Sequence, residues 1–93
     1  MLTCYLRIKN KLGLHARPAA KLANLARNFH AEIKVVKNNK EADAKSILDL
    51  LTLACKFEDK IKIEVNGEDE VKAFGLILCL LESEIGERVK NGS

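Results

Sequence analysis

The sequence predicts an α+β open-faced sandwich, in which three helices cover one face of a four-stranded antiparallel sheet. Short segments in which apolar and polar residues alternate are typical of strands with one buried and one solvated face. Longer segments rich in apolar residues at helical spacing lie between those strands. Because each strand offers only one apolar face to cover, the helices are expected on the same side of the sheet, in the order βαββαβα.

Four segments are predicted as strands. The first covers residues 2–9, where every second residue is apolar, and the second lies near residues 32–35. Asn38-Asn39 predicts a turn, since asparagine tolerates left-handed backbone angles, and a short third strand follows near residues 40–44. The fourth strand covers residues 60–65.

Three segments are predicted as helices. The first runs from residue 16 to about residue 28, and Pro18 fits its first turn because the N–H groups there have no intrahelical partner. The second and shorter helix covers residues 46–54. The third covers residues 68–84 and stops near Gly86, and its acidic start suits the positive end of the helix dipole.

The third helix is unusual because residues 73–81 are almost wholly apolar, whereas a helix on a sheet needs only one apolar stripe. The predicted buried stripe consists of Val71, Phe74, Leu78, Leu81 and Ile85. Three further apolar side chains would then be exposed or would cover a neighbouring helix: Leu76, Cys79 and Leu80. An exposed apolar group of this kind predicts weak self-association of a mostly monomeric protein.

Length and composition predict a small cytoplasmic protein. The 93 residues suit a single domain over 1–93, with a core at about 2–87 and a frayed tail at 88–93. Apolar residues make up 47% and charged residues 31%, which is the balance of a folded soluble protein. Three cysteines without Cys-x-x-Cys spacing predict free thiols in a reducing compartment. The apolar run 73–81 is too short to span a bilayer, which needs about 20 residues.

The charge balance limits which classes of binding partner are expected. A net charge of +3 favours acidic proteins or phosphate groups without requiring nucleic acid. RNA-binding modules with a similar order of strands and helices stack bases on aromatic side chains, and only 4% of the residues here are aromatic. We therefore expect no nucleic-acid partner.

The chemically informative stretch is residues 13–19, where His15 falls at the boundary between a loop and the first helix. Unpaired N–H groups and the helix dipole make such a boundary an anion site. Histidine titrates near neutral pH and can act as a nucleophile toward phosphorus, and the guanidinium of Arg17 suits bidentate contact with a phosphate. From the spacing alone, ordinary solvated side chains remain the alternative at both positions.

The stretch Gly-Leu-His-Ala-Arg-Pro-Ala at residues 13–19 resembles the active-site motif of the histidine-containing phosphocarrier protein HPr, a component of the phosphoenolpyruvate-dependent sugar phosphotransferase system. Residues 45–48, Lys-Ser-Ile-Leu, resemble the second signature of that family, and the order of strands and helices agrees from about residue 3 to residue 86. One segment departs from the family, because residues 54–59 replace a turn that is normally glycine-rich.

The resemblance implies a phosphoryl carrier that needs no metal or organic cofactor. His15 would accept the group on Nδ1 from phosphorylated enzyme I and donate it to an enzyme IIA domain of a sugar permease. Arg17 would pair with the phosphate, and the N–H groups of Ala16 and Arg17 would cradle it. The implied docking surface adds residues of the first and second helices: Ala20, Arg27, Ile47, Leu48 and Leu51. We expect no insertion into the membrane.

Ser46 has two interpretations. The order Ser46-Ile47-Leu48-Asp49 fits an N-cap, in which the serine hydroxyl accepts a hydrogen bond from the N–H of Asp49. By resemblance, Ser46 is also the regulatory serine that an HPr kinase/phosphorylase modifies in many bacteria. Asp49 departs from the family's usual glycine or lysine, and its carboxylate would repel a phosphate on Ser46.

Two alternatives to a role in sugar uptake remain open. A paralogue in a regulatory phosphotransferase branch would use the same His15 chemistry with a different enzyme I and enzyme IIA. A non-transferring interaction module would bind a partner without moving phosphate, and the presence of His15 argues against that class.

Overall fold

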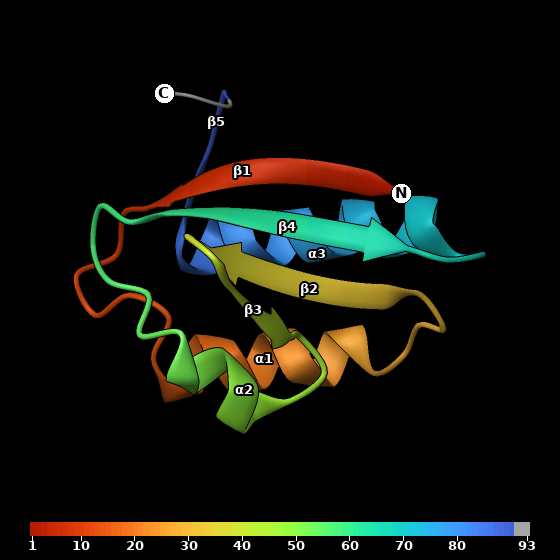
Figure 1. Cartoon of the computed structure of the whole chain (residues 1–93), viewed down its shortest axis with the longest axis horizontal. Helices are drawn as coiled ribbons and strands as arrows, with labels where there is room; N and C mark the ends of the chain where they lie inside the picture. Colours follow the sequence, from red (N-terminus) through yellow and green to blue (C-terminus); the bar gives the residue numbers. More distant parts are fainter. Residues whose placement is uncertain (91–93) are drawn as a thin grey trace.

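The computed structural model describes residues 1–90 (Figure 1). Its order of elements confirms the predicted alternation of strands and helices and adds one strand at the C-terminal end. The elements are β1 (Leu2–Ile8), α1 (Ala16–Ala26), β2 (Glu32–Lys37), β3 (Lys40–Asp43), α2 (Ile47–Thr52), β4 (Lys60–Asn66), α3 (Glu70–Glu84) and β5 (Gly86–Val89).

The sheet is antiparallel throughout, with the strand order β3-β2-β4-β1-β5. β4 lies at its centre, where Ile63 is opposite Cys4 of β1 and also opposite Val35 of β2. The alternate residues Ile61, Ile63 and Val65 are buried toward the helices. The lysine and glutamate residues between them therefore point to the other face of the sheet.

The sheet has five strands, so the prediction of four was wrong. β5 lies along the outer edge of β1, with Gly86 opposite Ile8 and Val89 opposite Tyr5. A Cβ atom on Gly86 would lie 2.1 Å from the carbonyl oxygen of Arg7, so only glycine allows this close approach. The strand forms because the edge of β1 would otherwise expose a row of unpaired backbone groups.

The predicted tail also needs correction, because residues 88 and 89 belong to β5 rather than to a frayed end. Their short charged sequence lacks the apolar alternation from which a strand can be recognised. Residues 91–93 of that predicted tail lie outside the described residues.

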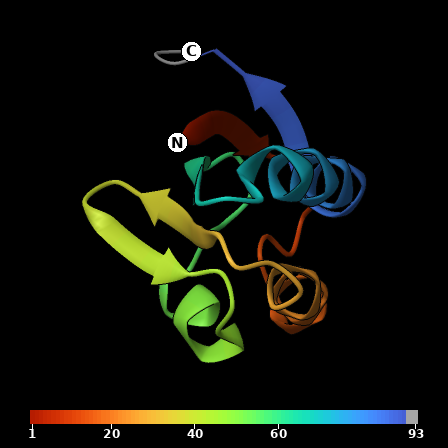
Figure 2. The same cartoon turned by 90° about the vertical axis from the view of Figure 1, so that its right-hand side faces the viewer.

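All three helices lie on one face of the sheet, as predicted (Figure 2). α1 packs against both α2 and α3, and the main core lies between this helical layer and the sheet. The largest fully buried side chains come from both layers: Leu6, Ile8, Leu22, Ile33, Val35, Leu50, Ile61, Ile63, Ile77, Leu78, Leu81 and Ile85. This packing holds α1 beside α2.

The buried side of α3 differs in part from the prediction. Leu78, Leu81 and Ile85 are buried as expected, and Phe74 is partly buried. Val71 is instead 76% exposed, and Ala73 and Ile77 take its place in the stripe. The sequence does not define the rotation of this helix because it is apolar on nearly every side.

The outer side of α3 carries Val71, Leu76 and Cys79, and Leu80 is partly buried against the core. Weak self-association through this side stays a prediction. No helix within residues 1–90 is long and apolar enough to cross a membrane.

Turn and cap residues confirm the local predictions. Asn38 has a positive φ of 55° in the turn between β2 and β3. In the first turn of α3, the Glu70 carboxylate accepts a hydrogen bond from the N–H of Gly67 at 3.1 Å, which satisfies a backbone donor just before the helix.

Candidate functional site

His15 is the N-cap residue of α1, where extended backbone (φ −88°, ψ −173°) passes into the helix. The loop before it is closed by Asn10, whose Nδ2 donates to the carbonyl oxygen of Gly13 at 2.8 Å. Leu14 is only 4% exposed and anchors the loop in the core. The half-buried His15 therefore follows a fixed residue, at the boundary that the sequence predicts.

The loop that carries Gly13 lies directly against the loop of residues 53–59, which joins α2 to β4. Gly13 has a φ of +68°, and a Cβ atom on it would lie 2.2 Å from the carbonyl oxygen of Cys55. The N–H of Leu14 donates to that same oxygen at 3.1 Å. The backbone of the second loop thus defines where the residues before His15 can lie.

The first turn of α1 offers two backbone donors to a ligand. Pro18 has no N–H, and the N–H of Ala19 donates to the carbonyl oxygen of His15 at 3.0 Å. Within residues 1–90, the N–H groups of Ala16 and Arg17 make no hydrogen bond, as expected for the start of a helix. The first turn contains no acidic residue. These two donors lie beside His15, where an anion bound to its ring would meet the positive end of the helix dipole.

Arg17 adds a full positive charge to this site. Its side chain is exposed and makes no ion pair with the described part of the chain. A guanidinium in this state needs no existing partner to be displaced before it contacts a phosphate. Ala16, His15 and Arg17 together form what we call the anion site.

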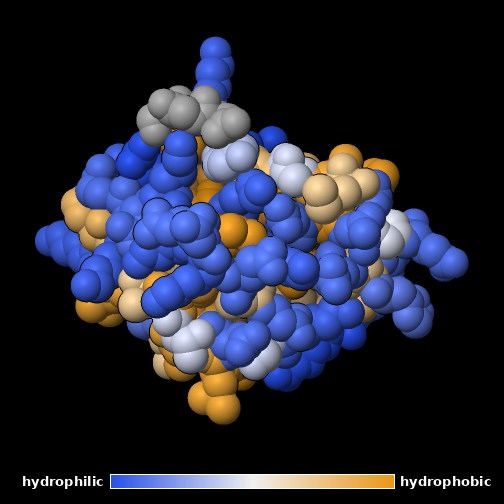
Figure 3. Space-filling view, in the orientation of Figure 1, coloured by the Kyte–Doolittle hydropathy of each residue, from blue (hydrophilic) through white to orange (hydrophobic). Residues whose placement is uncertain are grey.

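An exposed apolar group lies on α2, beside α1. Leu48 is 78% exposed and Leu51 is 36% exposed, whereas Ile47 is partly buried against the core. Figure 3 shows apolar side chains projecting from the lower edge of the molecule, where Figure 1 places α2. Ala20 of α1 is half-buried. The structure thus places the predicted docking residues on two adjacent helices.

Arg27 follows α1 and also joins the two helices. Its Nε donates to the carbonyl oxygen of Lys45 at 2.9 Å, just before α2 begins. Its side chain is exposed, so one guanidinium both supports the loop before α2 and faces solvent. Its predicted docking role stays a prediction.

Ser46 is the N-cap of α2, which confirms the first interpretation of this residue. Its Oγ accepts a hydrogen bond from the N–H of Asp49 at 3.2 Å. The Asp49 carboxylate turns back to accept from the N–H of Asp43 at 3.1 Å, and the Asp43 carboxylate accepts from the N–H of Lys45 at 2.9 Å. A phosphate on Ser46 would therefore have two carboxylates nearby.

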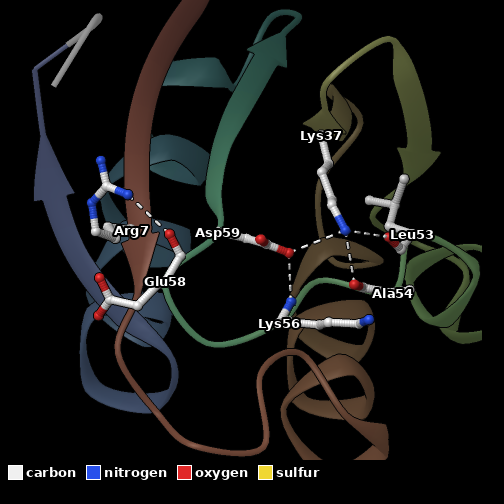
Figure 4. A network of polar contacts seen from close by, with 7 residues as sticks. All are labelled: Arg7, Lys37, Leu53, Ala54, Lys56, Glu58 and Asp59. Atoms are coloured by element: carbon white, nitrogen blue, oxygen red, sulfur yellow. Dashed lines mark hydrogen bonds and ion pairs between the residues drawn. The ribbon is translucent and has the colours of Figure 1, made fainter.

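Sequence reasoning missed the lysine that holds the loop of residues 53–59 (Figure 4). Nζ of Lys37, at the end of β2, donates to the carbonyl oxygens of Leu53 at 3.3 Å and Ala54 at 2.9 Å. It also forms an ion pair with Oδ2 of Asp59 at 3.0 Å. We call the Lys37–Asp59 pair with these bonds the lysine clamp. A lysine at the end of a strand carries no sequence signal of such a role.

The Asp59 carboxylate of the clamp also accepts from the N–H of Lys56 at 2.8 Å. Burial by itself raises the pKa of this carboxyl group, but the Lys56 N–H and the Lys37 ammonium lower it by more. The net pKa lies below the ordinary value of 3.8, so the carboxylate is ionised and the pair is charged at neutral pH.

The remaining titratable candidates do not lie in the anion site. The three cysteines are free, as predicted, and burial raises the pKa of the Cys55 thiol to about 11, which leaves it a poor nucleophile at neutral pH. His30 is exposed after α1, and its N–H donates to Asp69 at 2.8 Å. No group of three or more His, Cys, Asp and Glu side chains within residues 1–90 could hold a metal ion.

Comparison with known proteins gives one consistent result. A family model described as "PTS HPr component phosphorylation site" matches residues 3–83. Phosphocarrier protein HPr of Cupriavidus necator is 42% identical over 80 residues, which cover 86% of this chain and 90% of that protein. Phosphocarrier protein NPr of Shewanella violacea is 44% identical over 80 residues, covering 86% and 88%. A solved structure of a histidine-containing phosphocarrier protein from Mycoplasma has a TM-score of 0.86 at 33% identity, covering 88% of this chain and 93% of that one.

Proposed function

Since the chain belongs to the HPr family, the phosphocarrier proteins of the phosphotransferase system, we propose that His15 carries the phosphoryl group. Phosphorylated enzyme I is the proposed donor and an enzyme IIA domain the proposed acceptor, with the exchange taking place in the cytoplasm. The observation that carries the proposal is the position of His15 as the N-cap of α1, beside two unused backbone donors.

The proposed transfer exchanges one phosphorus–nitrogen bond for another. The lone pair on Nδ1 of His15 attacks the phosphorus of the donor's phosphohistidine, while Nε2 of His15 keeps its proton. The donor ring carries a proton on its other nitrogen and leaves as neutral imidazole with the electron pair of the broken bond. The N–H groups of Ala16 and Arg17 and the Arg17 guanidinium stabilise the negative charge on the phosphoryl oxygens. The same contacts hold the group on His15 until the acceptor histidine attacks it.

We propose that the partners dock on the adjacent faces of α1 and α2. Leu48, Leu51 and Ile47 supply apolar contact area, and Ala20 lies on the neighbouring helix. Arg17 and Arg27 supply positive charge at the edge, which favours partners with acidic side chains around an apolar centre.

A second question is which branch of the phosphotransferase system the chain serves, because its sequence is about equally similar to relatives named HPr and NPr. We propose the general sugar branch first and the regulatory branch as the alternative. Ser46 would serve as a regulatory site only where an HPr kinase/phosphorylase tolerates the nearby carboxylates of Asp43 and Asp49.

The test is incubation with phosphoenolpyruvate and a general enzyme I, followed by intact mass measurement and acid treatment. An acid-labile gain of one phosphoryl group is expected in the wild type, and its absence in His15→Ala. His30→Ala is the matched control and should gain the group normally, since His30 lies outside the anion site. Transfer only from a regulatory-branch enzyme I would favour the alternative branch. No transfer from either enzyme I would contradict the carrier proposal.

A further inference from the structure

We propose that Lys37 and Asp59 are positioning residues for His15, which act by holding the loop of residues 53–59 against the loop that carries Gly13 and Leu14. The inference rests on the proposed function, because it concerns the rate at which His15 accepts a phosphoryl group. It assigns a role in transfer to two residues that lie outside both the anion site and the docking face.

The first observation is strain in the loop of residues 53–59. Ala54 has a φ of +51° and Glu58 a φ of +75°, although neither is glycine. The left-handed region is unfavourable for residues that carry a Cβ atom, and it persists only where the surrounding structure holds it. Something must therefore stabilise this loop from outside.

The second observation is that the lysine clamp joins both ends of this loop. Lys37 donates to the carbonyl oxygens of Leu53 and Ala54 at its start and pairs with Asp59 at its end. The side chains of Lys37 and Asp59 are only 21% and 31% exposed, so water screens their attraction less than it screens a surface pair. The N–H of Lys56 is bound to the same carboxylate, which fixes the middle of the loop.

The third observation is that the backbone of the loop of residues 53–59 determines the position of the residues before His15. The carbonyl oxygen of Cys55 accepts from the N–H of Leu14 at 3.1 Å and leaves room only for glycine at position 13. At its other end the loop is bound to β1, because the N–H of Glu58 donates to the carbonyl oxygen of Ile8 at 2.8 Å. A change of φ at residue 54 would move the Cys55 carbonyl and, with it, Leu14.

A shift of Leu14 would move His15, which is part of the anion site. His15 follows Leu14 directly, and its N–H donates to the carbonyl oxygen of Gly13 at 3.0 Å. Transfer needs the ring nitrogen of His15 in line with the phosphorus and the leaving nitrogen of the donor, and the helix N–H groups at the phosphoryl oxygens. A misplacement of about 1 Å can cost up to about 100-fold in rate. The lysine clamp therefore acts on transfer through geometry, without touching the phosphoryl group.

The test compares Lys37→Met with Lys62→Met in the complete chain. Lys62 also forms an ion pair, with Glu64 at 2.8 Å on the uncovered face of the sheet, so its substitution removes the same charge away from the loop. Lys37→Met is expected to slow phosphoryl acceptance from enzyme I about tenfold, and Lys62→Met to change it less than twofold. In NMR spectra, the Leu14 amide signal should shift, and its hydrogen exchange should accelerate, only in Lys37→Met.

A rescue variant separates positioning from general stability. Glycine adopts positive φ without a steric penalty, so Ala54→Gly and Glu58→Gly added to Lys37→Met should restore acceptance to within about twofold of the wild type. The glycines also raise stability, so urea unfolding of every variant is measured beside its rate. A slow rate in a Lys37→Met protein that is fully folded under the assay conditions reports a change of position. Where Lys37→Met fails to fold by circular dichroism, Asp59→Asn replaces it with the same expected slowing and rescue.

Two outcomes would overturn the inference. One is equal rates for the folded Lys37 and Lys62 variants, and the other is a slow Lys37 variant that the glycines do not rescue. Both outcomes assume that the wild type accepts the phosphoryl group at its normal rate. If the carrier proposal itself were wrong, the wild type would accept no phosphoryl group.

Discussion

Replacement of Gly13 by alanine is the change that most directly tests the contact between the two loops. The new Cβ atom would lie 2.2 Å from the carbonyl oxygen of Cys55 and 3.0 Å from Cα of Lys56. Both neighbours are backbone atoms, so no side chain can rotate away to relieve the clash. The backbone of one loop must move instead.

The expected loss of stability follows from three contributions. The left-handed φ of +68° costs alanine about 1–2 kcal/mol relative to glycine. Movement of the loops breaks the hydrogen bond from Leu14 to Cys55, which contributes about 1 kcal/mol. Alanine recovers about 0.5–1 kcal/mol because its unfolded chain is less flexible. We therefore expect the free energy of unfolding to fall by about 2 kcal/mol, and the melting temperature by about 10 °C.

Gly75→Ala is the matched control, since Gly75 lies inside α3 and an added Cβ would meet no atom within 4 Å apart from the adjacent residues and the nearby backbone of the helix itself. The same chemical change should stabilise the protein there by about 0.5–1 kcal/mol. Urea unfolding followed by circular dichroism measures both effects, and phosphoryl acceptance should fall in Gly13→Ala alone. A change below about 0.5 kcal/mol in Gly13→Ala, with normal acceptance, would refute the close contact of the loops.

Three further predictions follow from caps and titratable groups. Ser46→Ala should lower the free energy of unfolding by about 1 kcal/mol in urea titrations, whereas Ser83→Ala, in an exposed turn of α3, should stay within about 0.5 kcal/mol. The N–H groups of His30 and Ala31 hold the pKa of Asp69 in the folded protein below its ordinary value of 3.8. The ionised Asp69 carboxylate therefore stabilises the fold fully above pH 3.8, and this stabilisation is lost as the pH falls through the lower pKa of the folded protein. In Asp69→Asn, the melting temperature should therefore fall less steeply than in the wild type as the pH is lowered below about 4. An unchanged pH dependence of the melting temperature would contradict this. A thiol reagent at pH 8 should modify exposed Cys79 quickly and buried Cys55 only on unfolding, and equal rates would be inconsistent with the described burial.

Local signals in the sequence were enough to predict most of the fold and the candidate site. The alternation in β1 and β4 depends only on which face of each strand is buried, so it can be counted along the chain. The cap at Ser46 and the start of α1 after His15 depend on residues within one turn of each other. For the same reason, the two backbone donors beside His15 could be expected before any tertiary contact was known.

Tertiary structure alone decided the features that depend on distant partners. β5 forms because the edge of β1 needs hydrogen bonds, although its own sequence has no strand pattern. The buried side of α3 is chosen by packing on the sheet and α1, since its sequence is apolar almost all round. Lys37 meets Leu53, Ala54 and Asp59 only because β2 ends beside the loop before β4. Such contacts arise from where the folded chain places its segments, so no pattern among neighbouring residues could have indicated them.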